Sequence, residues 1–371
     1  MASYPSPSVQ LAKPVAEGPL VSIVVPMLNE ERYIGGCLDS ILAGSFPLEQ
    51  CEVLVVDGGS VDGSREIVRA RSEQHPSLRL LDNPRRIQGA AMNIGIQNAR
   101  GKYILRMDAH SEYPRDYVQN CVEELERTGA DNVGGTWEVT PGRPDFLARA
   151  LTLTVQHWFG VGNAKYRTGG DGYVDTVPFG AFRRELFSRV GLFRENLAVH
   201  EDYEMNARIR AAGGRIYLSG RIRNTYYQES SFRGYFRKAW NYGYWVARWC
   251  MLHPHSFAWR HFVPLCFVLA LLGGAALAPF WRPAAVGLAA MLAAYALFAI
   301  GSSLELGRRG GWRYAPLLPG LFFLRHITYG LGTLAGMVDH FIRPVPDEGP
   351  PKLEVDQPVC GAPGAPPSSP S

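Results

Sequence analysis

The chain has 371 residues, of which 46% are apolar and 19% are charged, enough for one large domain with an ample core and an appendage. Its formal net charge of +4 is small and scattered, and no nucleic-acid-binding module is recognisable, so a nucleic-acid partner is excluded. The six cysteines form no CxxC pair, so they signal neither a zinc site nor a disulfide framework.

Both ends of the chain have low complexity. Residues 1–19 are rich in Pro and Ser and lack the apolar segment of a signal peptide, and residues 344–371 are rich in Pro and Gly. Such compositions cannot bury enough apolar surface to fold, so we expect two disordered tails.

From residue 20 the sequence alternates short apolar runs with amphipathic segments. The apolar runs are residues 21–25, 51–57, 78–83 and 102–108, and the segments with helical periodicity are 30–42, 64–74 and 88–99. Short strands alternating with helices predict an α/β domain, over residues 20–230, with a doubly wound, mostly parallel sheet. In such sheets, ligands bind outside the carboxyl ends of the strands.

Polar residues follow these strands. The first is followed by Asn29 and Glu30, the second by Asp57, and the fourth by Asp108 and His110. One such residue is as well explained by a turn or a helix cap, but several on one edge predict a polar crevice. No glycine fingerprint or P-loop follows a strand, which disfavours a dinucleotide or P-loop site. A carboxylate and an imidazole suit Mg²⁺ or Mn²⁺ bound to a nucleotide diphosphate.

The C-terminal part contains three apolar runs. Residues 262–280 and 284–304 are uncharged and long enough to cross a bilayer, with a pair of buried core helices as the alternative. The third run, residues 316–338, contains Arg325 and His326; it could span, re-enter or lie in the interface, with a spanning or re-entrant helix favoured. We therefore expect transmembrane helices over residues 262–343.

The arginines between these runs predict an orientation. Arg308, Arg309 and Arg313 lie between the second and third runs, whereas Arg282 alone lies between the first two. By the positive-inside rule, the longer loop and the domain before residue 262 are cytoplasmic. The expected location is the plasma (inner) membrane, crossed more than once, with the catalytic domain in the cytoplasm.

These motifs resemble the family 2 glycosyltransferases, which have a GT-A fold, and most of all the membrane-anchored, succinoglycan-type glucosyltransferases of bacterial exopolysaccharide synthesis. The similar stretches, within residues 20–260, are "VSIVVPMLNEERYI", "VLVVDGGSVDGS", "NPRRIQGAAMNIGIQNARGKYILRMDAH" and "VPFGAFRRELFSRVGLFRENLAVHEDYEMNARIRAAGGRIY". The resemblance implies that the nucleotide pocket is lined by Pro26, Asn29, Glu30, Asp57 and Asp108. It also implies that Asp108 and His110 stand at the Asp-X-Asp metal motif, where His at the third position departs from the commoner pattern.

The resemblance also implies the acceptor side. By family position Asp202 is the candidate catalytic base, with Glu201 beside it tuning its pKa or binding the acceptor. The alternative is that Asp202 only caps the helix that follows. Residues 176–184 would form an acceptor-side loop, in which Gly180 lets the backbone approach a sugar.

Residues 231–261 mix basic and aromatic side chains and predict an amphipathic segment at the membrane surface. Arg237 and Trp240 fall near the (Q/R)xxRW position of processive members, but the pattern is incomplete, so we do not expect processivity. The basic residues could meet the diphosphate of a lipid acceptor, and a simple interfacial anchor explains them equally well.

Together these features predict an inverting hexosyltransferase that uses Mg²⁺ or Mn²⁺. It would move a hexose, with glucose expected, from a UDP-hexose or similar nucleotide sugar to a lipid-linked glycan at the membrane. One alternative has a bare polyprenyl phosphate as the acceptor. Another is a non-catalytic membrane-anchored scaffold that binds nucleotides or polysaccharide, against which Asp108 and Asp202 argue because both carboxylates are intact.

Overall fold

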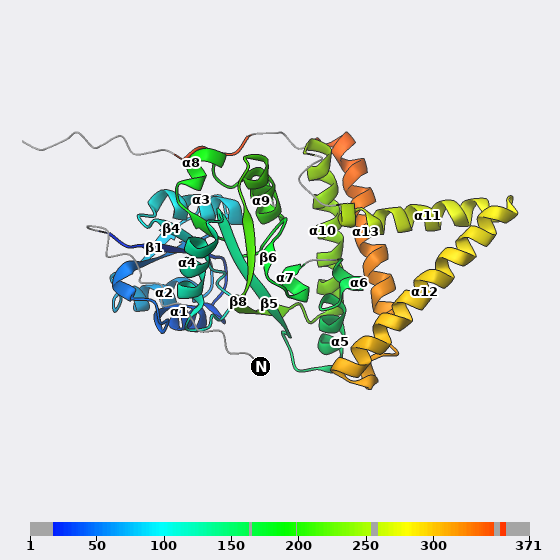
Figure 1. Ribbon diagram of the computed structural model, residues 1–371, viewed down its shortest axis with the longest axis horizontal. Coiled ribbons are helices and arrows are strands. Elements are labelled where there is room, and N and C mark those ends of the chain that lie inside the picture. The colour runs from blue at the N-terminus through cyan, green and yellow to red at the C-terminus, as the bar shows by residue number, and fades with distance from the viewer. Residues whose placement is uncertain (1–17, 163–164, 198, 254–258, 345–348, 354–371) are drawn as a thin grey trace, which may run out of the picture.

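The computed structural model describes residues 18–162, 165–197, 199–253, 259–344 and 349–353. The expected tails lie outside these residues except for 18, 19, 344 and 349–353. The last of these segments packs on the domain, because the N–H of Leu192 donates to the carbonyl of Pro351 and Leu353 contacts a hydrophobic cluster, so the prediction of disorder is wrong for residues 349–353. In Figure 1, a mixed sheet with helices on both faces lies on one side and the long C-terminal helices lie on the other.

The described residues contain one eight-stranded sheet with the order β3-β2-β1-β4-β7-β5-β8-β6. Its strands are β1 (Val21–Met27), β2 (Cys51–Asp57), β3 (Leu78–Asp82), β4 (Tyr103–Arg106), β5 (Asn132–Pro141), β6 (Gly172–Tyr173), β7 (Ala181–Arg183) and β8 (Ile216–Gln228). β1 to β4 pair in parallel and β5 pairs in parallel with β8, whereas β7 and β6 run antiparallel to their neighbours. The prediction of a doubly wound, mostly parallel sheet is confirmed.

Alternation along β1 shows why the sheet is covered on both faces. Val21, Ile23 and Val25 pack into one hydrophobic cluster, and Val24 packs into another on the opposite face. Side chains two residues apart share a face of a strand, so an all-apolar strand needs cover on both sides. Burial of both faces of β1 is typical of the parallel part of such a sheet.

Helices from different parts of the chain provide that cover. The helices of this half are α1 (Ile34–Leu42), α2 (Ser64–Ser72), α3 (Gln88–Asn98), α4 (Tyr117–Thr128), α5 (Phe146–Val155), α6 (Trp158–Val161), α7 (Lys165–Thr168), α8 (Leu186–Val190) and α9 (Glu201–Ala211), with a short 3₁₀ helix η1 (Leu48–Gln50). α1, α2 and α4 pack on one face of the sheet, and α3, α8 and α9 pack on the other.

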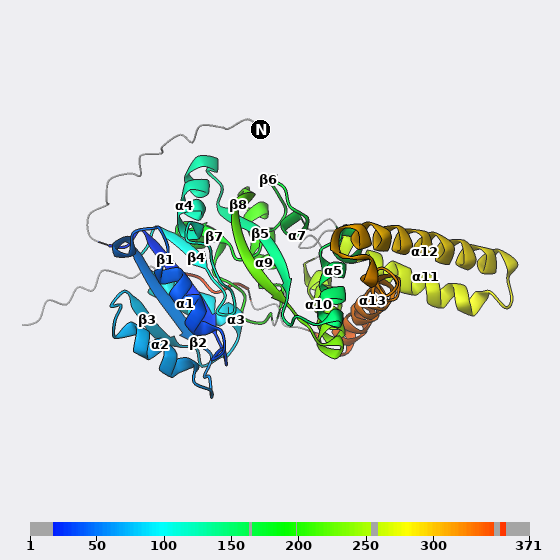
Figure 2. The ribbon, with the colours of Figure 1, turned by 90° about the horizontal axis from the view of Figure 1, so that it is seen from below.

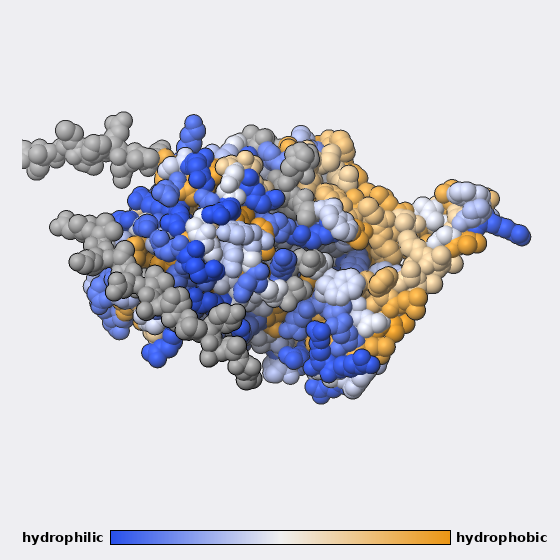
Figure 3. Space-filling view, in the orientation of Figure 1, coloured by the Kyte–Doolittle hydropathy of each residue, from blue (hydrophilic) through white to orange (hydrophobic). Residues whose placement is uncertain are grey.

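The remaining helices form a C-terminal helical part. They are α10 (Phe232–Leu252), α11 (Val263–Leu277), α12 (Arg282–Gly310) and α13 (Leu318–Ile342), with 3₁₀ turns η3 (Trp259–His261) and η4 (Trp312–Tyr314). Among the described residues, three helical stretches are long and apolar enough to cross a membrane: Trp259–Leu277, Arg282–Gly310 and Leu318–Ile342. The hydrophobic surface in Figure 3 lies over these helices.

The four helices are arranged in two pairs. α11 and α12 form a hairpin that projects away from the sheet domain, while α10 and α13 run side by side across its base (Figures 1 and 2). The third apolar run forms one uninterrupted helix, which excludes a re-entrant turn within it.

Arg325 and His326, the polar interruption of that run, face protein. Arg325 Nε donates to the carbonyl of Gly160 at 2.9 Å, and His326 Nε2 contacts the carbonyl of Phe159 at the same distance. The two side chains therefore satisfy backbone groups of α6, which lies against the membrane helices. Polar groups within an apolar helix are tolerated when they are paired within the protein.

Glycines allow α10 and α13 to approach closely. A Cβ at Gly332 would lie 2.4 Å from the carbonyl oxygen of Trp240, and one at Gly336 would lie 2.2 Å from that of Tyr244. The two glycines are four residues apart, so they share one face of α13, as in other small-residue packing motifs of membrane helices.

We predict that Gly332→Ala and Gly336→Ala each lower the thermal unfolding midpoint of the detergent-solubilised protein. The added methyl group must push α10 and α13 apart, and overpacking of this kind costs about 1–3 kcal/mol. Gly320→Ala is the matched control on the same helix, because a Cβ there meets nothing within 4 Å. Equal midpoints for all three variants would contradict this account of the packing.

Candidate functional site

A buried arginine at the end of β4 organises the polar end of the sheet. The Arg106 side chain is 4% exposed and contacts three carboxylates: Asp108 at 2.9 Å, Glu201 at 2.9 Å and Asp202 at 2.6 Å. Residues nearly one hundred positions apart in the chain thereby meet at one guanidinium. Sequence reasoning placed Asp108 and Asp202 in one site but missed Arg106, although an arginine ending an apolar strand was a visible signal.

Asp202 lies in the first turn of α9 but does not cap it. The residue at the N-cap position is His200, with a φ of 70°, and Asp202 is the second residue of the helix. The Asp202 carboxylate accepts a hydrogen bond from Arg106 through Oδ1, and no hydrogen bond reaches Oδ2 from the described residues. The interpretation of Asp202 as a simple helix cap is therefore wrong.

The environment of Asp202 suits a proton acceptor. Burial raises its pKa to about 7, against the attraction of Arg106, and the neighbouring charges of Glu201 and Asp108 add to the rise. A carboxylate with a pKa near neutrality balances availability and basicity in general-base catalysis. Glu204, one turn further along α9, is bound at 3.0 Å by Arg194 and at 2.6 Å by Arg208, so it has a structural role.

Asp108 and His110 lie on a tightly held loop after β4. The backbone N–H of Asp108 donates to the Tyr113 hydroxyl at 2.6 Å, and His110 Nδ1 contacts Glu30 Oε1 at 3.0 Å. The bond to Glu30 is the main cause of the raised pKa of His110. Pairing through Nδ1 leaves Nε2 as the nitrogen available for a ligand, as in second-shell support of metal-bound histidines.

The donor set fits a hard divalent cation with few protein ligands. Three carboxylates surround one guanidinium, which leaves excess negative charge that a cation would offset. Within the described ranges, no three His, Cys, Asp or Glu side chains are grouped to hold a metal ion. A cation held by Asp108 and His110 would therefore complete its shell with phosphate oxygens and water, a pattern typical of Mg²⁺.

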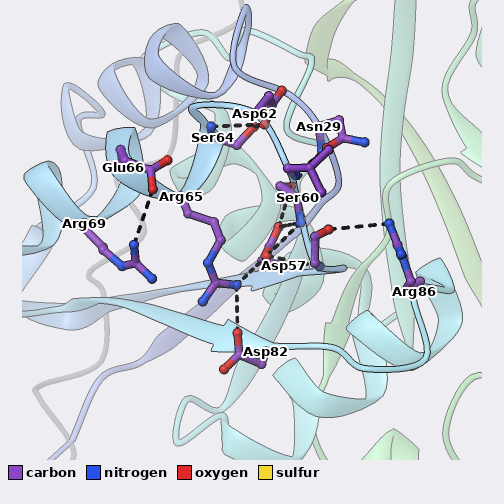
Figure 4. Close-up of polar contacts among 12 residues, drawn as sticks. Asn29, Asp57, Ser60, Asp62, Ser64, Arg65, Glu66, Arg69, Asp82 and Arg86 are labelled. Atoms are coloured by element: carbon purple, nitrogen blue, oxygen red, sulfur yellow. Dashed lines mark hydrogen bonds and ion pairs between the residues drawn. The ribbon is translucent and has the colours of Figure 1, made fainter.

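Two of the predicted nucleotide residues, Asn29 and Asp57, lie close together at the ends of β1 and β2 (Figure 4). The Asp57 carboxylate is fully buried and accepts hydrogen bonds from Ser60 Oγ and from Arg65 Nη1, both at 2.5 Å. Burial raises the pKa of Asp57, but the hydrogen bonds from Ser60 and Arg65 outweigh it, so the net shift is downward. Asp57 thus fixes the turn after β2 with an ionised carboxylate whose oxygens are already occupied.

Asn29 joins the tips of β1 and β2. Its φ is 55°, its side-chain oxygen accepts from the N–H of Val61 at 2.9 Å, and its own N–H donates to Ser60 Oγ at 2.8 Å. Pro26 lies in β1, two residues after Val24, the last residue of β1 that pairs with β4. Because Pro26 has no N–H to donate, it is tolerated at a position where β1 no longer pairs with β4.

A cavity of about 810 Å³ extends from Arg106, Asp108, His110, Glu201 and Asp202 to the membrane helices. Its lining includes residues of the loop before β7 (Thr176, Val177, Pro178 and Phe179), of α10 (Lys238 and Tyr242), of α11 (Val263, Pro264 and Phe267), and Tyr295, Arg325, His326 and Tyr329 from α12 and α13. The predicted metal and catalytic residues are thus brought into one cavity, whereas Pro26, Asn29, Glu30 and Asp57 lie outside its lining.

The three residues predicted for the acceptor side are not part of that lining. Gly180 is buried, and a Cβ there would lie 2.4 Å from Asn132 Oδ1, so close packing within the domain requires this glycine. Arg237 is exposed, and the backbone of Trp240 packs against Gly332 of α13. Their neighbours Phe179, Lys238 and Tyr242 face the cavity instead.

Comparison with known proteins gives the family context. Residues 22–191 match the family model described as glycosyl transferase family 2. The succinoglycan biosynthesis protein ExoA of Rhizobium meliloti (strain 1021) is 32% identical over 323 residues, which covers 85% of this chain and 94% of that protein.

A second relative and a solved structure agree with this. A dolichyl N-acetyl-α-D-glucosaminyl phosphate 3-β-D-2,3-diacetamido-2,3-dideoxy-β-D-glucuronosyltransferase of Methanococcus voltae is 25% identical over 262 residues, 68% of this chain and 80% of that protein. The mannosyltransferase PcManGT of Pyrobaculum calidifontis, solved with GDP-Man and Mn²⁺, superposes with a TM-score of 0.58 at 22% identity, over 86% of this chain and 88% of that one. The likeness to PcManGT is a likeness of fold.

We predict that Arg106→Met lowers the free energy of unfolding by about 3–5 kcal/mol, because it leaves buried carboxylates without a counter-charge. Arg69→Met is the matched control, since the Arg69 side chain is 56% exposed and its pair with Glu66 lies on the surface, where such pairs contribute less than about 1 kcal/mol. The unfolding midpoints of both purified variants test this, and a similar small loss in both would contradict it.

Proposed function

Because this chain belongs to glycosyl transferase family 2 and has its GT-A fold, we propose that it transfers a hexose from a nucleoside diphosphate sugar to a lipid-linked glycan at a membrane surface. The observation that carries this proposal is the single cavity in which Asp108 and Asp202 meet and which continues to the apolar helices. A soluble acceptor would not need a cavity lined by the apolar helices α11, α12 and α13, whereas a lipid-linked acceptor would.

The relatives support the class of acceptor. ExoA acts in the biosynthesis of succinoglycan, a polysaccharide, and the M. voltae relative is named for a dolichyl-linked sugar phosphate. The name of the M. voltae relative favours a lipid-linked sugar over a bare polyprenyl phosphate as the acceptor. The hexose, for which glucose is our proposal, and the nucleobase of the donor, for which we propose uracil, rest on the resemblance to succinoglycan-type enzymes.

The proposed mechanism is a single displacement with inversion at the anomeric carbon. Asp202 takes the proton from the acceptor hydroxyl through Oδ2 while Arg106 holds Oδ1, so the carboxylate keeps one orientation as the hydroxyl oxygen attacks. Glu201, bound to the same guanidinium, fixes Arg106 and keeps negative charge beside the base. Asp108 and His110 would hold Mg²⁺ or Mn²⁺, which when bound neutralises charge on the departing diphosphate.

The edge formed by the tips of β1 and β2 is the proposed nucleotide side. Pro26, Asn29, Glu30 and Asp57 shape it, and the contacts of Asp57 and Asn29 make it rigid before a ligand arrives. A rigid edge lowers the conformational entropy lost on binding.

We propose that the catalytic domain is cytoplasmic and that the protein is anchored in the plasma membrane. Leu306 and Tyr314, which flank Arg308, Arg309 and Arg313, pack in one hydrophobic cluster with Leu151 of α5. This packing supports the proposal that Arg308, Arg309 and Arg313 lie on the same side as the catalytic domain. Arg282 is at the opposite end of α12.

The function is tested with membranes that contain the protein and a panel of radiolabelled nucleoside diphosphate sugars. One donor should label a lipid extract in the presence of Mn²⁺ or Mg²⁺, the label should be released by mild acid, and a chelator should abolish labelling. Labelled lipid from no donor would refute the proposal, and undiminished labelling with chelator would refute the metal dependence.

In the same assay, Asp202→Asn should reduce transfer by about 10²–10⁴-fold, the usual contribution of a general base, while nucleoside diphosphate binding is retained. Asparagine keeps the size of the side chain and an acceptor for Arg106, so folding should survive. Asp39→Asn is the control, because the Asp39 side chain is 63% exposed on α1 and pairs only with Arg71 among the described residues. Near-normal transfer by Asp202→Asn would remove this residue from the mechanism.

For the orientation, a reporter fused after Arg309 should read cytoplasmic and one fused in the turn before Arg282 should read external, because the two positions lie at opposite ends of α12. An external signal from the fusion after Arg309 would overturn the proposed topology.

A further inference from the structure

The membrane end of the cavity opens between aromatic residues. Trp158, Trp259 and Val263 line the cavity and are also 50%, 79% and 47% exposed, so they mark its mouth. Tryptophans gather at membrane–water interfaces, where an amphipathic ring is best solvated. Inside this mouth the walls are largely apolar or aromatic, with Phe159 from α6, Phe267 from α11 and Tyr295 from α12.

Five arginine and lysine side chains line this cavity, and they differ in what neutralises them. Arg106 contacts the three carboxylates described above, and Arg260 contacts Asp175 at 2.7 Å. Arg325 donates to the Gly160 carbonyl. Arg167 and Lys238 form no ion pair with any carboxylate of the described residues.

Arg167 and Lys238 are instead held by aromatic rings. The Arg167 guanidinium carbon lies 4.6 Å from the ring centre of Trp137 and 5.8 Å from that of Tyr226, and its Nη1 is buried without a hydrogen-bond partner. Lys238 Nζ lies 5.1 Å from the ring centre of Tyr226 and donates to the hydroxyl of the same residue. One tyrosine thus contacts both cations.

This arrangement leaves two positive charges with unused donors in the wall of the cavity. Aromatic faces attract cations but accept no strong hydrogen bond from them, so the guanidinium and ammonium groups keep their capacity for an anion. Buried charges are normally paired, and an unpaired set in a ligand cavity points to a charge supplied by the ligand.

We propose that Arg167 and Lys238 bind the phosphate head of the lipid-linked acceptor, whose apolar chain leaves through the mouth at Trp158, Trp259 and Val263. This inference rests on the proposed function and identifies the residues that bind the phosphate of the lipid carrier. A nucleotide sugar has no apolar chain to occupy the walls of α11 and α12, whereas a lipid-linked acceptor has one. The glycan of the acceptor would then reach Asp202, which lines the same cavity.

The test measures binding by the full-length protein in detergent, with farnesyl diphosphate as a short isoprenoid diphosphate and farnesol as its uncharged counterpart. Arg167→Gln and Lys238→Gln should each weaken farnesyl diphosphate binding by about 10- to 100-fold, the effect expected for one charged hydrogen bond, and leave farnesol binding unchanged. Arg167→Lys, which keeps the charge, should lose less than Arg167→Gln.

Control variants and control ligands test whether the effect is specific to these two cations and to the lipid phosphate. Lys165→Gln on α7 and Arg233→Gln on α10 remove exposed cations that do not line the cavity, and both should bind farnesyl diphosphate like the wild type. Binding of UDP and of GDP with Mn²⁺ should be unchanged in Arg167→Gln and Lys238→Gln, which also shows that they are folded.

Unchanged farnesyl diphosphate affinity in both glutamine variants would overturn the inference. Loss of nucleotide binding in place of farnesyl diphosphate binding would also overturn it, by assigning the two cations to the donor. Because the assay needs no turnover, its outcome is separate from that of the proposed function: absence of any sugar transfer with intact, cation-dependent lipid binding would refute the function and leave the phosphate site standing.

Discussion

The buried guanidinium of Arg106 is the interaction on which the site depends. It ends β4 and contacts carboxylates from the loop after β4 and from the first turn of α9, so the two halves of the sheet domain are tied at one point. A buried cation is stable only when it is compensated, and the three acids are kept close together only because the cation lies between them. The arrangement therefore fixes Asp202 relative to Asp108, which a displacement reaction requires.

The catalytic domain and the membrane helices share a core. One hydrophobic cluster contains Val139 of β5, Leu151 of α5, Tyr226 of β8 and Phe322 of α13. Two backbone carbonyls of α6 form hydrogen bonds with Arg325 and His326 of α13. The helical connection between β5 and β6 is therefore fixed against α13. A cavity lined by both parts follows from this shared packing. Under the proposed function, this cavity is the route by which a lipid-linked acceptor reaches Asp202.

The two ends of the site differ in how their charges are satisfied. At the nucleotide edge, the oxygens of Asp57 are occupied by Ser60 and Arg65, which makes that edge a rigid support. At the acceptor end, Arg167 and Lys238 rest on aromatic rings and have no carboxylate partner among the described residues. A polar group whose hydrogen bonds are all made within the protein stabilises the fold, whereas a buried one with unused donors can bind a ligand. We therefore assign a structural role to Asp57 and a ligand-binding role to Arg167 and Lys238.

The sequence by itself determined the sheet, the apolar helices and the residues that end strands. The extents of β1 to β4 follow from apolar runs of strand length, and Asp108 lies at the polar edge because it comes directly after such a run. These are local properties, set by a period of two in strands and by the length of an apolar helix. The motifs also identified Asp202 as the candidate base, because a family resemblance assigns a residue by its position in the sequence and not by its distance from other residues.

Only the tertiary structure decided which side chains face the cavity. Arg237 and Lys238 are neighbours on α10, yet Lys238 lines the cavity and Arg237 is exposed, since the packing of α10 against α13 fixes the rotation of the helix. Arg167 comes from a short helix with no motif, and the partners that make Arg106 and Asp202 a pair are 96 positions apart. Periodicity reports the face of a single element, whereas a site depends on which elements meet, and that is set by the packing of the whole chain.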